Sequence, residues 1–181
     1  DTCVLPKAKI KLPFTDVKAE KFYTDAIQWA AKEKIVSTSS KKFSPGKTCT
    51  RAEMITYLWR AAGSPKVKKS NPFTDVKKSN YYYDAAIWAY SKGMVSGKKF
   101  AGSTACTRIE VVYYLWKNAG APEGYYVTNY QDLSTKYCTA AGWALVNGVT
   151  AGDSTYSFSA KKKCNRAEVI TFIYRAIHGV E

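Results

Sequence analysis

The strongest constraint on the fold is a unit of 57 to 58 residues that occurs three times in the chain. Its marker is an arginine that follows Thr or Asn and precedes a glutamate by two positions; it lies at Arg51, Arg108 and Arg166. Tandem copies of this kind repeat one supersecondary unit, and each copy buries its apolar face against its neighbours. We therefore predict one compact domain with a shared core.

The three copies contain the same segments in the same order. Each opens with a turn that holds an aromatic residue and an aspartate, and continues through an apolar pattern around a tryptophan. A polar loop and a second apolar pattern follow, and the three- and four-residue spacing in both patterns predicts amphipathic helices. The predicted divisions are a leading segment at residues 1–12 and repeats at residues 13–65, 72–122 and 129–179.

The second predicted helix of each copy begins with a capping signal. A Thr or Asn stands at the N-cap position and a glutamate follows three residues later, which is the pattern of a capping box. The predicted pairs are Thr50 with Glu53, Thr107 with Glu110, and Asn165 with Glu168. We interpret these six residues as structural.

A cysteine precedes each cap, at the position of a hydrophobic staple. Cys49, Cys106 and Cys164 are predicted to be small buried hydrophobic residues. The alternative is metal binding or redox chemistry, but no two cysteines have the CxxC spacing typical of zinc sites. We predict no metal site and no cofactor.

The chain is strongly basic, with 28 Lys and Arg against 14 Asp and Glu, which leaves a net charge of +14. Such a field attracts nucleic acid, acidic glycan, wall polymer or anionic lipid without choosing among them. The alternative is a lysine-rich surface that only keeps the protein in solution. No apolar run approaches the roughly 20 residues of a membrane helix, so we expect no membrane insertion.

The arginine of each copy has no local structural explanation. One residue into a helix it faces the positive end of the helix dipole, which costs about 0.3–1 kcal/mol at an exposed site. It either pairs with a carboxylate of its own fold or binds an anionic ligand at the helix N-terminus. The candidate carboxylates are Asp16, Asp75 and Asp132.

Two other classes of protein fit the sequence poorly. An enzyme is not expected, because the acidic residues outside the repeated positions are scattered and the single histidine, His178, lies at a helix end. No phosphate loop or dinucleotide fingerprint is present. Nucleic-acid binding rests on net charge alone, since no module pattern or reading helix supports it.

The ordered set of motifs resembles the S-layer homology (SLH) domain in three tandem copies, from about Leu12 to His178. The motifs are Phe-Thr-Asp-Val, Tyr-x-Asp-Ala-Ile-x-Trp-Ala, Phe-Ser-Pro, Thr-Arg-Ala-Glu and Leu-Trp-Arg-Ala-Ala-Gly. The resemblance implies a mainly α fold. It also implies a pseudo-threefold trimer of helix-loop-helix repeats in one chain, with one helix of each repeat in a central three-helix bundle.

The resemblance further implies noncovalent anchoring at the bacterial cell surface through secondary cell-wall polysaccharide, bound in grooves between repeats. A pyruvate ketal on such a polymer is a carboxylate, which would account for the arginines. The implied groove residues are Arg51, Arg108, Arg166, Asp16, Asp75, Asp132, Trp29, Trp88, Trp143, Gly97 and Gly152. We expect a monomeric module, compatible with a larger surface protein. The alternative is an adhesin or other surface protein whose basic repeats bind another polyanion or a host ligand.

The three copies are unequal, which bears on which groove binds. Lys34 and Thr38 of the first copy stand where the others have glycines that would support a left-handed backbone. Those glycines are Gly93 and Gly97 in the second copy and Gly148 and Gly152 in the third. We expect the groove that uses the first copy's loop to be altered or closed, and the Arg108 groove to bind best.

Two cysteines lie outside the repeated position. In the ring that the resemblance implies, the start of the chain and the third repeat are neighbours. A disulfide between Cys3 and Cys138 would then be geometrically feasible in an exported protein. Free thiols in both residues are the alternative.

Overall fold

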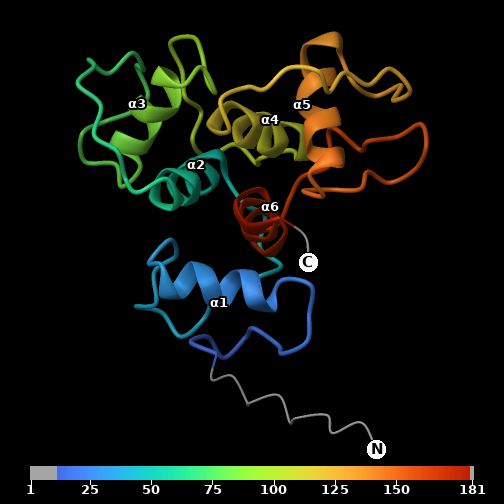
Figure 1. The fold of residues 1–181 in the computed structure, drawn as a ribbon. Coiled ribbons are helices and arrows are strands. Elements are labelled where there is room, and N and C mark those ends of the chain that lie inside the picture. The colour runs from blue at the N-terminus through green and yellow to red at the C-terminus, as the bar shows by residue number, and fades with distance from the viewer. Residues whose placement is uncertain (1–11, 180–181) are drawn as a thin grey trace, which may run out of the picture.

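The computed structural model describes residues 12–179, and this part of the chain is helical and without extended strands (Figure 1). The mainly α fold expected from the sequence is confirmed. The helices are α1 (Thr24–Lys32), α2 (Arg51–Ala61), α3 (Tyr83–Ser91), α4 (Arg108–Asn118), α5 (Thr135–Val146) and α6 (Arg166–His178).

Capping boxes position the starts of α2, α4 and α6, as the sequence predicts. At α2 the backbone N–H of Thr50 donates to Glu53 Oε2 at 2.9 Å, and the N–H of Glu53 donates back to Thr50 Oγ1 at 3.2 Å. These bonds satisfy backbone donors that have no partner within the helix. Each of the three helices therefore begins at its arginine.

The helices are arranged as a closed ring of contacts around a centre. Helices α2, α4 and α6 contact one another pairwise, while α3 packs on α2, α5 on α4 and α1 on α6. The second helix of each repeat thus packs on the first helix of the next, and the third repeat packs on the first. This cyclic order is what a pseudo-threefold arrangement requires, although the symmetry of the whole molecule stays a prediction.

The three staple cysteines join the repeats at the entry to the central helices. The backbone N–H of Cys49 donates to the carbonyl of Cys164, that of Cys106 to Cys49, and that of Cys164 to Cys106, each at 2.9 Å. Their side chains are at most 1% exposed. Burial raises the pKa of all three thiols, so the cysteines serve as buried hydrophobic residues.

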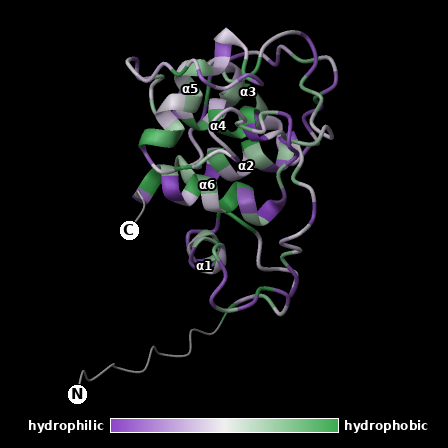
Figure 2. Ribbon diagram, turned by 90° about the vertical axis from the view of Figure 1, so that its right-hand side faces the viewer, coloured by the Kyte–Doolittle hydropathy of each residue, from purple (hydrophilic) through white to green (hydrophobic). Residues whose placement is uncertain are grey.

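One contiguous core links the three repeats, and it includes the loop residues Phe43, Phe100 and Phe158. Strongly hydrophobic segments lie mostly in the helices (Figure 2). No helix within residues 12–179 combines the length and the apolar character that a membrane crossing requires.

Cys138 is buried in α5, and its Sγ donates to the Ser134 carbonyl at 3.5 Å. Its proposed disulfide partner, Cys3, lies outside the described residues, so the disulfide stays a prediction.

Candidate anion-binding grooves between the repeats

Arg51 joins the first repeat to the second. Its Nη1 donates to the Phe100 carbonyl at 2.7 Å, and its Nη2 donates to Glu110 Oε1 at 2.5 Å. Both charged side chains are 20% exposed. Burial raises the pKa of Glu110, but hydrogen bonds from the Thr107 backbone and from Arg51 outweigh it and lower the pKa overall. The pair is therefore ionised and half-buried at the repeat interface.

Arg166 joins the third repeat to the first in a looser arrangement. Its Nη1 lies 3.9 Å from Glu53 Oε1, and its guanidinium lies 4.7 Å from the centroid of the Phe43 ring. The side chain is 19% exposed. A cation–π contact thus supplements a long ion pair.

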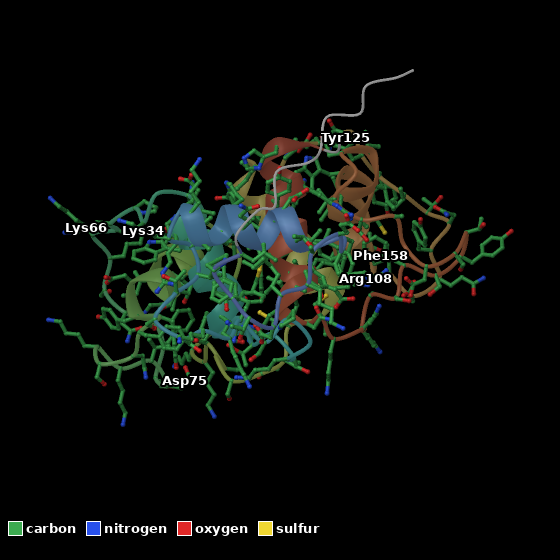
Figure 3. All side chains as sticks on the ribbon, turned by 90° about the horizontal axis from the view of Figure 1, so that it is seen from below. Lys34, Lys66, Asp75, Arg108, Tyr125 and Phe158 are labelled. Carbon is green, nitrogen blue, oxygen red and sulfur yellow. The ribbon has the colours of Figure 1, made fainter. Side chains whose placement is uncertain are left out.

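Arg108 joins the second repeat to the third and departs from this pattern. Its Nη1 donates to Asp153 Oδ1 at 2.8 Å and to the Phe158 carbonyl at 3.1 Å, and Figure 3 shows Arg108 close to Phe158. Glu168, which corresponds to Glu110 in the repeat pattern, instead lies 3.4 Å from Lys162 Nζ. The Arg108 side chain is only 8% exposed.

The ion-pair partners of the arginines are therefore Glu110, Asp153 and Glu53, and not the three aspartates expected from the sequence. Each aspartate instead accepts two backbone N–H groups from the loop of its own repeat, at 2.8 Å. The pairs of donors are Phe43 and Ser44 to Asp16, Phe100 and Ala101 to Asp75, and Phe158 and Ala160 to Asp132. We call this arrangement the aspartate clasp.

The aspartate clasp alters the acidity of its three carboxyls in the same way. Burial raises their pKa, but the backbone hydrogen bonds outweigh it, so the pKa of Asp16, Asp75 and Asp132 is lower than usual. The clasp orients the loop that precedes each arginine. The aspartates thereby position the groove wall, and their contact with a ligand stays a prediction.

A cavity of about 180 Å³ lies beside Arg51 and draws on all three repeats. The loop from Met94 to Lys99 and helix α4 form much of its wall, and Lys136 and Tyr137 of α5 complete it. Lys136 Nζ lies 5.2 Å from the ring centroid of Tyr113 and 5.1 Å from that of Tyr137. The cavity thus combines a guanidinium, two ammonium groups, the Glu110 carboxylate that pairs with Arg51, and aromatic rings.

The predicted tryptophans and Gly152 do not line this cavity, and Gly97 lies in its wall loop between the lining residues Ser96 and Lys99. Trp88 and Trp143 are 1% and 6% exposed and belong to the core, whereas Trp29 is half-buried in a separate pocket between α1 and α6. Gly97 and Gly152 have φ of +86° and +72° in their loops. Their roles in ligand binding stay predictions.

Most residues that line the Arg51 cavity were absent from the sequence-based site, and the polar and aromatic ones of interest are Lys99, Lys136, Tyr113 and Tyr137. The adjacent tyrosines of the second repeat were the available signal, since sugar sites need aromatic faces. No sequence pattern marked the two lysines as cavity residues, because many lysines are spread along the chain. Only the packing of α5 on α4 brings Lys136 to the cavity.

Comparison with known proteins yields a consistent group of matches. The model of the S-layer homology domain matches residues 13–55 and 72–112. An amylopullulanase of Thermoanaerobacterium thermosulfurigenes is 27% identical over 178 residues, which cover 89% of this chain and 9% of the relative. An endoglucanase of Bacillus sp. (strain KSM-635) is 29% identical over 86% of this chain and 18% of the relative. An S-layer protein of Bacillus thuringiensis subsp. finitimus is 28% identical over 94% of this chain and 22% of the relative. The chain thus spans less than a quarter of the length of these relatives.

Proposed function

Since the chain belongs to the S-layer homology domain family through residues 13–55 and 72–112, we propose that it anchors a larger protein by binding anionic cell-wall polysaccharide. The family is one of cell-surface and cell-wall anchoring modules. We further propose that residues 129–179 form a third repeat of the family and that the module is monomeric. The anchoring module by itself does not indicate which activity the larger protein has.

The observation that carries the proposal is the chemistry of the Arg51 cavity. A guanidinium can match a carboxylate with two parallel donors, and Lys99 and Lys136 also line the cavity, so that its positive charges outnumber the one carboxylate, Glu110. The rings of Tyr113 and Tyr137 offer flat apolar faces for a sugar. A glycan that carries a pyruvate ketal supplies both a carboxylate and a sugar ring, and so fits this set of groups.

We assign the principal binding groove to Arg51 instead of Arg108. Arg51 is 20% exposed and lines a cavity, whereas Arg108 is 8% exposed, and each of the two guanidiniums donates to two acceptors of its own fold. Arg166, with a long ion pair and 19% exposure, is the second candidate. The accessibility of the guanidinium decides the assignment, because an anion must reach it from solvent.

The test is co-sedimentation with purified cell-wall sacculi before and after mild acid treatment, which removes pyruvate ketals. We expect wild-type binding to fall with the ketal, and Arg51→Lys to weaken binding about tenfold because the bidentate fork is lost while the charge remains. A matched control replaces Lys66, an exposed linker residue, by Ala. Its binding should stay close to that of the wild type.

The salt dependence of binding separates this function from its alternative. Binding that survives ketal removal but fades with salt, and that Lys66→Ala and Arg51→Lys weaken equally, would contradict the proposal. Such a result would favour an adhesin or surface protein that uses its basic charge to bind polyanions in general.

A further inference from the structure

We propose that Asp153 occupies the anion site at Arg108 from within the chain, so that the groove between the second and third repeats is closed to ligand. This inference rests on the proposed function, because it concerns which of the three arginines can receive an anionic glycan. It assigns Asp153 as a specificity-determining residue, which no repeat motif predicts.

The first support is the geometry at Arg108. Asp153 Oδ1 accepts from Arg108 Nη1 at 2.8 Å, and Asp153 Oδ2 accepts from the hydroxyl of Ser159. Both carboxylate oxygens are therefore bound. The Phe158 carbonyl accepts from the same Nη1, so a ligand carboxylate that binds at Nη1 would have to displace one of these acceptors.

The second support is the origin of the partner carboxylate. At Arg51 and Arg166 it comes from a capping-box glutamate on a central helix, Glu110 or Glu53, and also binds the helix N-cap. Those glutamates are fixed parts of the groove wall. Asp153 comes from an exposed loop and its side chain is 46% exposed. It therefore approaches Arg108 from the solvent side, as an incoming ligand would.

The third support is the length and shape of the loop that carries Asp153. The stretch from Gly152 to Phe158 is three residues longer than the equivalent stretch from Gly97 to Phe100. Backbone N–H groups of Asp153 and Ser154 both donate to the Ser157 carbonyl at 3.1 Å, which turns the loop back on itself.

Gly152 makes this turn feasible and so places Asp153 at Arg108. Its φ is +72°, and an added Cβ would lie 3.3 Å from the hydroxyl oxygen of Tyr130. This loop is three residues longer than that of the second repeat and one residue longer than the stretch from Thr38 to Phe43 in the first. The longest of the three loops, which begins at a glycine, is thus the one that delivers a carboxylate to the arginine.

The binding test compares wild type, Asp153→Ala and Asp84→Ala. The control removes the same charge from an exposed residue in the first turn of α3. The probe is a methyl hexoside that carries a pyruvate ketal, titrated by isothermal calorimetry. We expect Asp153→Ala to add a binding site per chain, and Asp84→Ala to leave the number of sites unchanged. Combining Asp153→Ala with Arg108→Gln should remove the added site.

An unchanged number of sites in Asp153→Ala overturns the proposal, as does the loss of a site when Arg108→Gln is made in the wild-type background. A wild type without binding at any site would contradict the proposed function instead. In that case, a measurement that needs no glycan tests whether Asp153 blocks the anion site at Arg108.

That second measurement is the rate at which phenylglyoxal, an arginine-selective reagent, modifies Arg108, followed by mass spectrometry of the peptides. Asp153→Ala should accelerate the modification of Arg108 several-fold and leave that of Arg51 unchanged. Equal rates at Arg108 in the wild type and both variants would overturn the proposal regardless of any ligand.

Discussion

At the scale of single residues, the aspartate clasp uses one carboxylate per repeat to fix the conformation of the loop before the arginine. Asp75 illustrates the point, because its two oxygens bind the backbone N–H groups of Phe100 and Ala101. Ala101 has a φ of +52°, a conformation that non-glycine residues rarely adopt. The hydrogen bonds to Asp75 help to hold this residue in place.

We predict that Asp75→Asn lowers the free energy of unfolding by about 1–3 kcal/mol, because an amide cannot accept both backbone bonds as a charged group does. Urea denaturation at neutral pH measures the change. The control Asp84→Asn removes the same charge in the first turn of α3 and should cost below about 1 kcal/mol. Equal costs for the two variants would refute the structural role of the clasp.

The clasp also predicts a dependence of stability on pH. The clasp lowers the pKa of Asp16, Asp75 and Asp132 in the folded state. Its contribution is therefore complete above the unfolded-state value of about 3.9 and is lost as pH falls through the folded-state pKa. We expect the melting temperature to fall below about pH 4, and to fall less steeply in Asp75→Asn. Parallel curves for the two proteins would contradict this assignment.

The arginine partners show why part of the site could not be predicted from the sequence. A capping box is local, so Thr50 and Glu53 reveal it directly. The partner of Arg51 lies 59 residues away, and only the packing of consecutive repeats brings it close. The charge of the three aspartates made them candidate ion-pair partners of the arginines. Their carboxylates instead accept hydrogen bonds from backbone N–H groups of their own loops.

At the scale of helices and loops, the first repeat keeps the geometry of the others without their glycine. Lys34 has a φ of +57°, close to the +66° of Gly93 and the +65° of Gly148. Its N–H donates to the Ala31 carbonyl at 3.2 Å. The backbone at the end of α1 is thus left-handed as in the other repeats. Lysine in place of glycine at this position therefore adds backbone strain but leaves the course of the backbone nearly unchanged.

We predict that Lys34→Gly raises the free energy of unfolding by about 0.5–1 kcal/mol, because relief of the left-handed strain exceeds the added entropy of the unfolded chain. Gly93→Ala is the matched variant, and it should destabilise the protein by a similar amount. Urea denaturation of both proteins tests the pair. A destabilised Lys34→Gly would show that this lysine makes contacts that outweigh its backbone strain.

At the scale of the whole molecule, the order of helices and the shared core follow from the repeat alone. Period, capping signals and apolar spacing are properties of each copy, and units that share them bury equivalent faces. The differences between grooves do not follow, because they depend on single residues such as Asp153 and Lys136 that break the repeat. The proposed choice of ligand groove therefore depends on these departures as well as on the repeated motif.

The ring of contacts makes the third repeat necessary for the first. Helix α1 packs on α6, and α5 packs on α4, so removing residues 123–181 uncovers one face of α1 and one of α4. We predict that residues 1–122 alone show no cooperative thermal transition, since the lost burial exceeds the 5–15 kcal/mol of net stability typical of a domain. Circular dichroism measures the transition. Adding the separate fragment 123–181 should restore it, because the same faces are then covered in trans. A cooperative transition in the 1–122 fragment alone would show that two repeats suffice and that the ring is not the unit of folding.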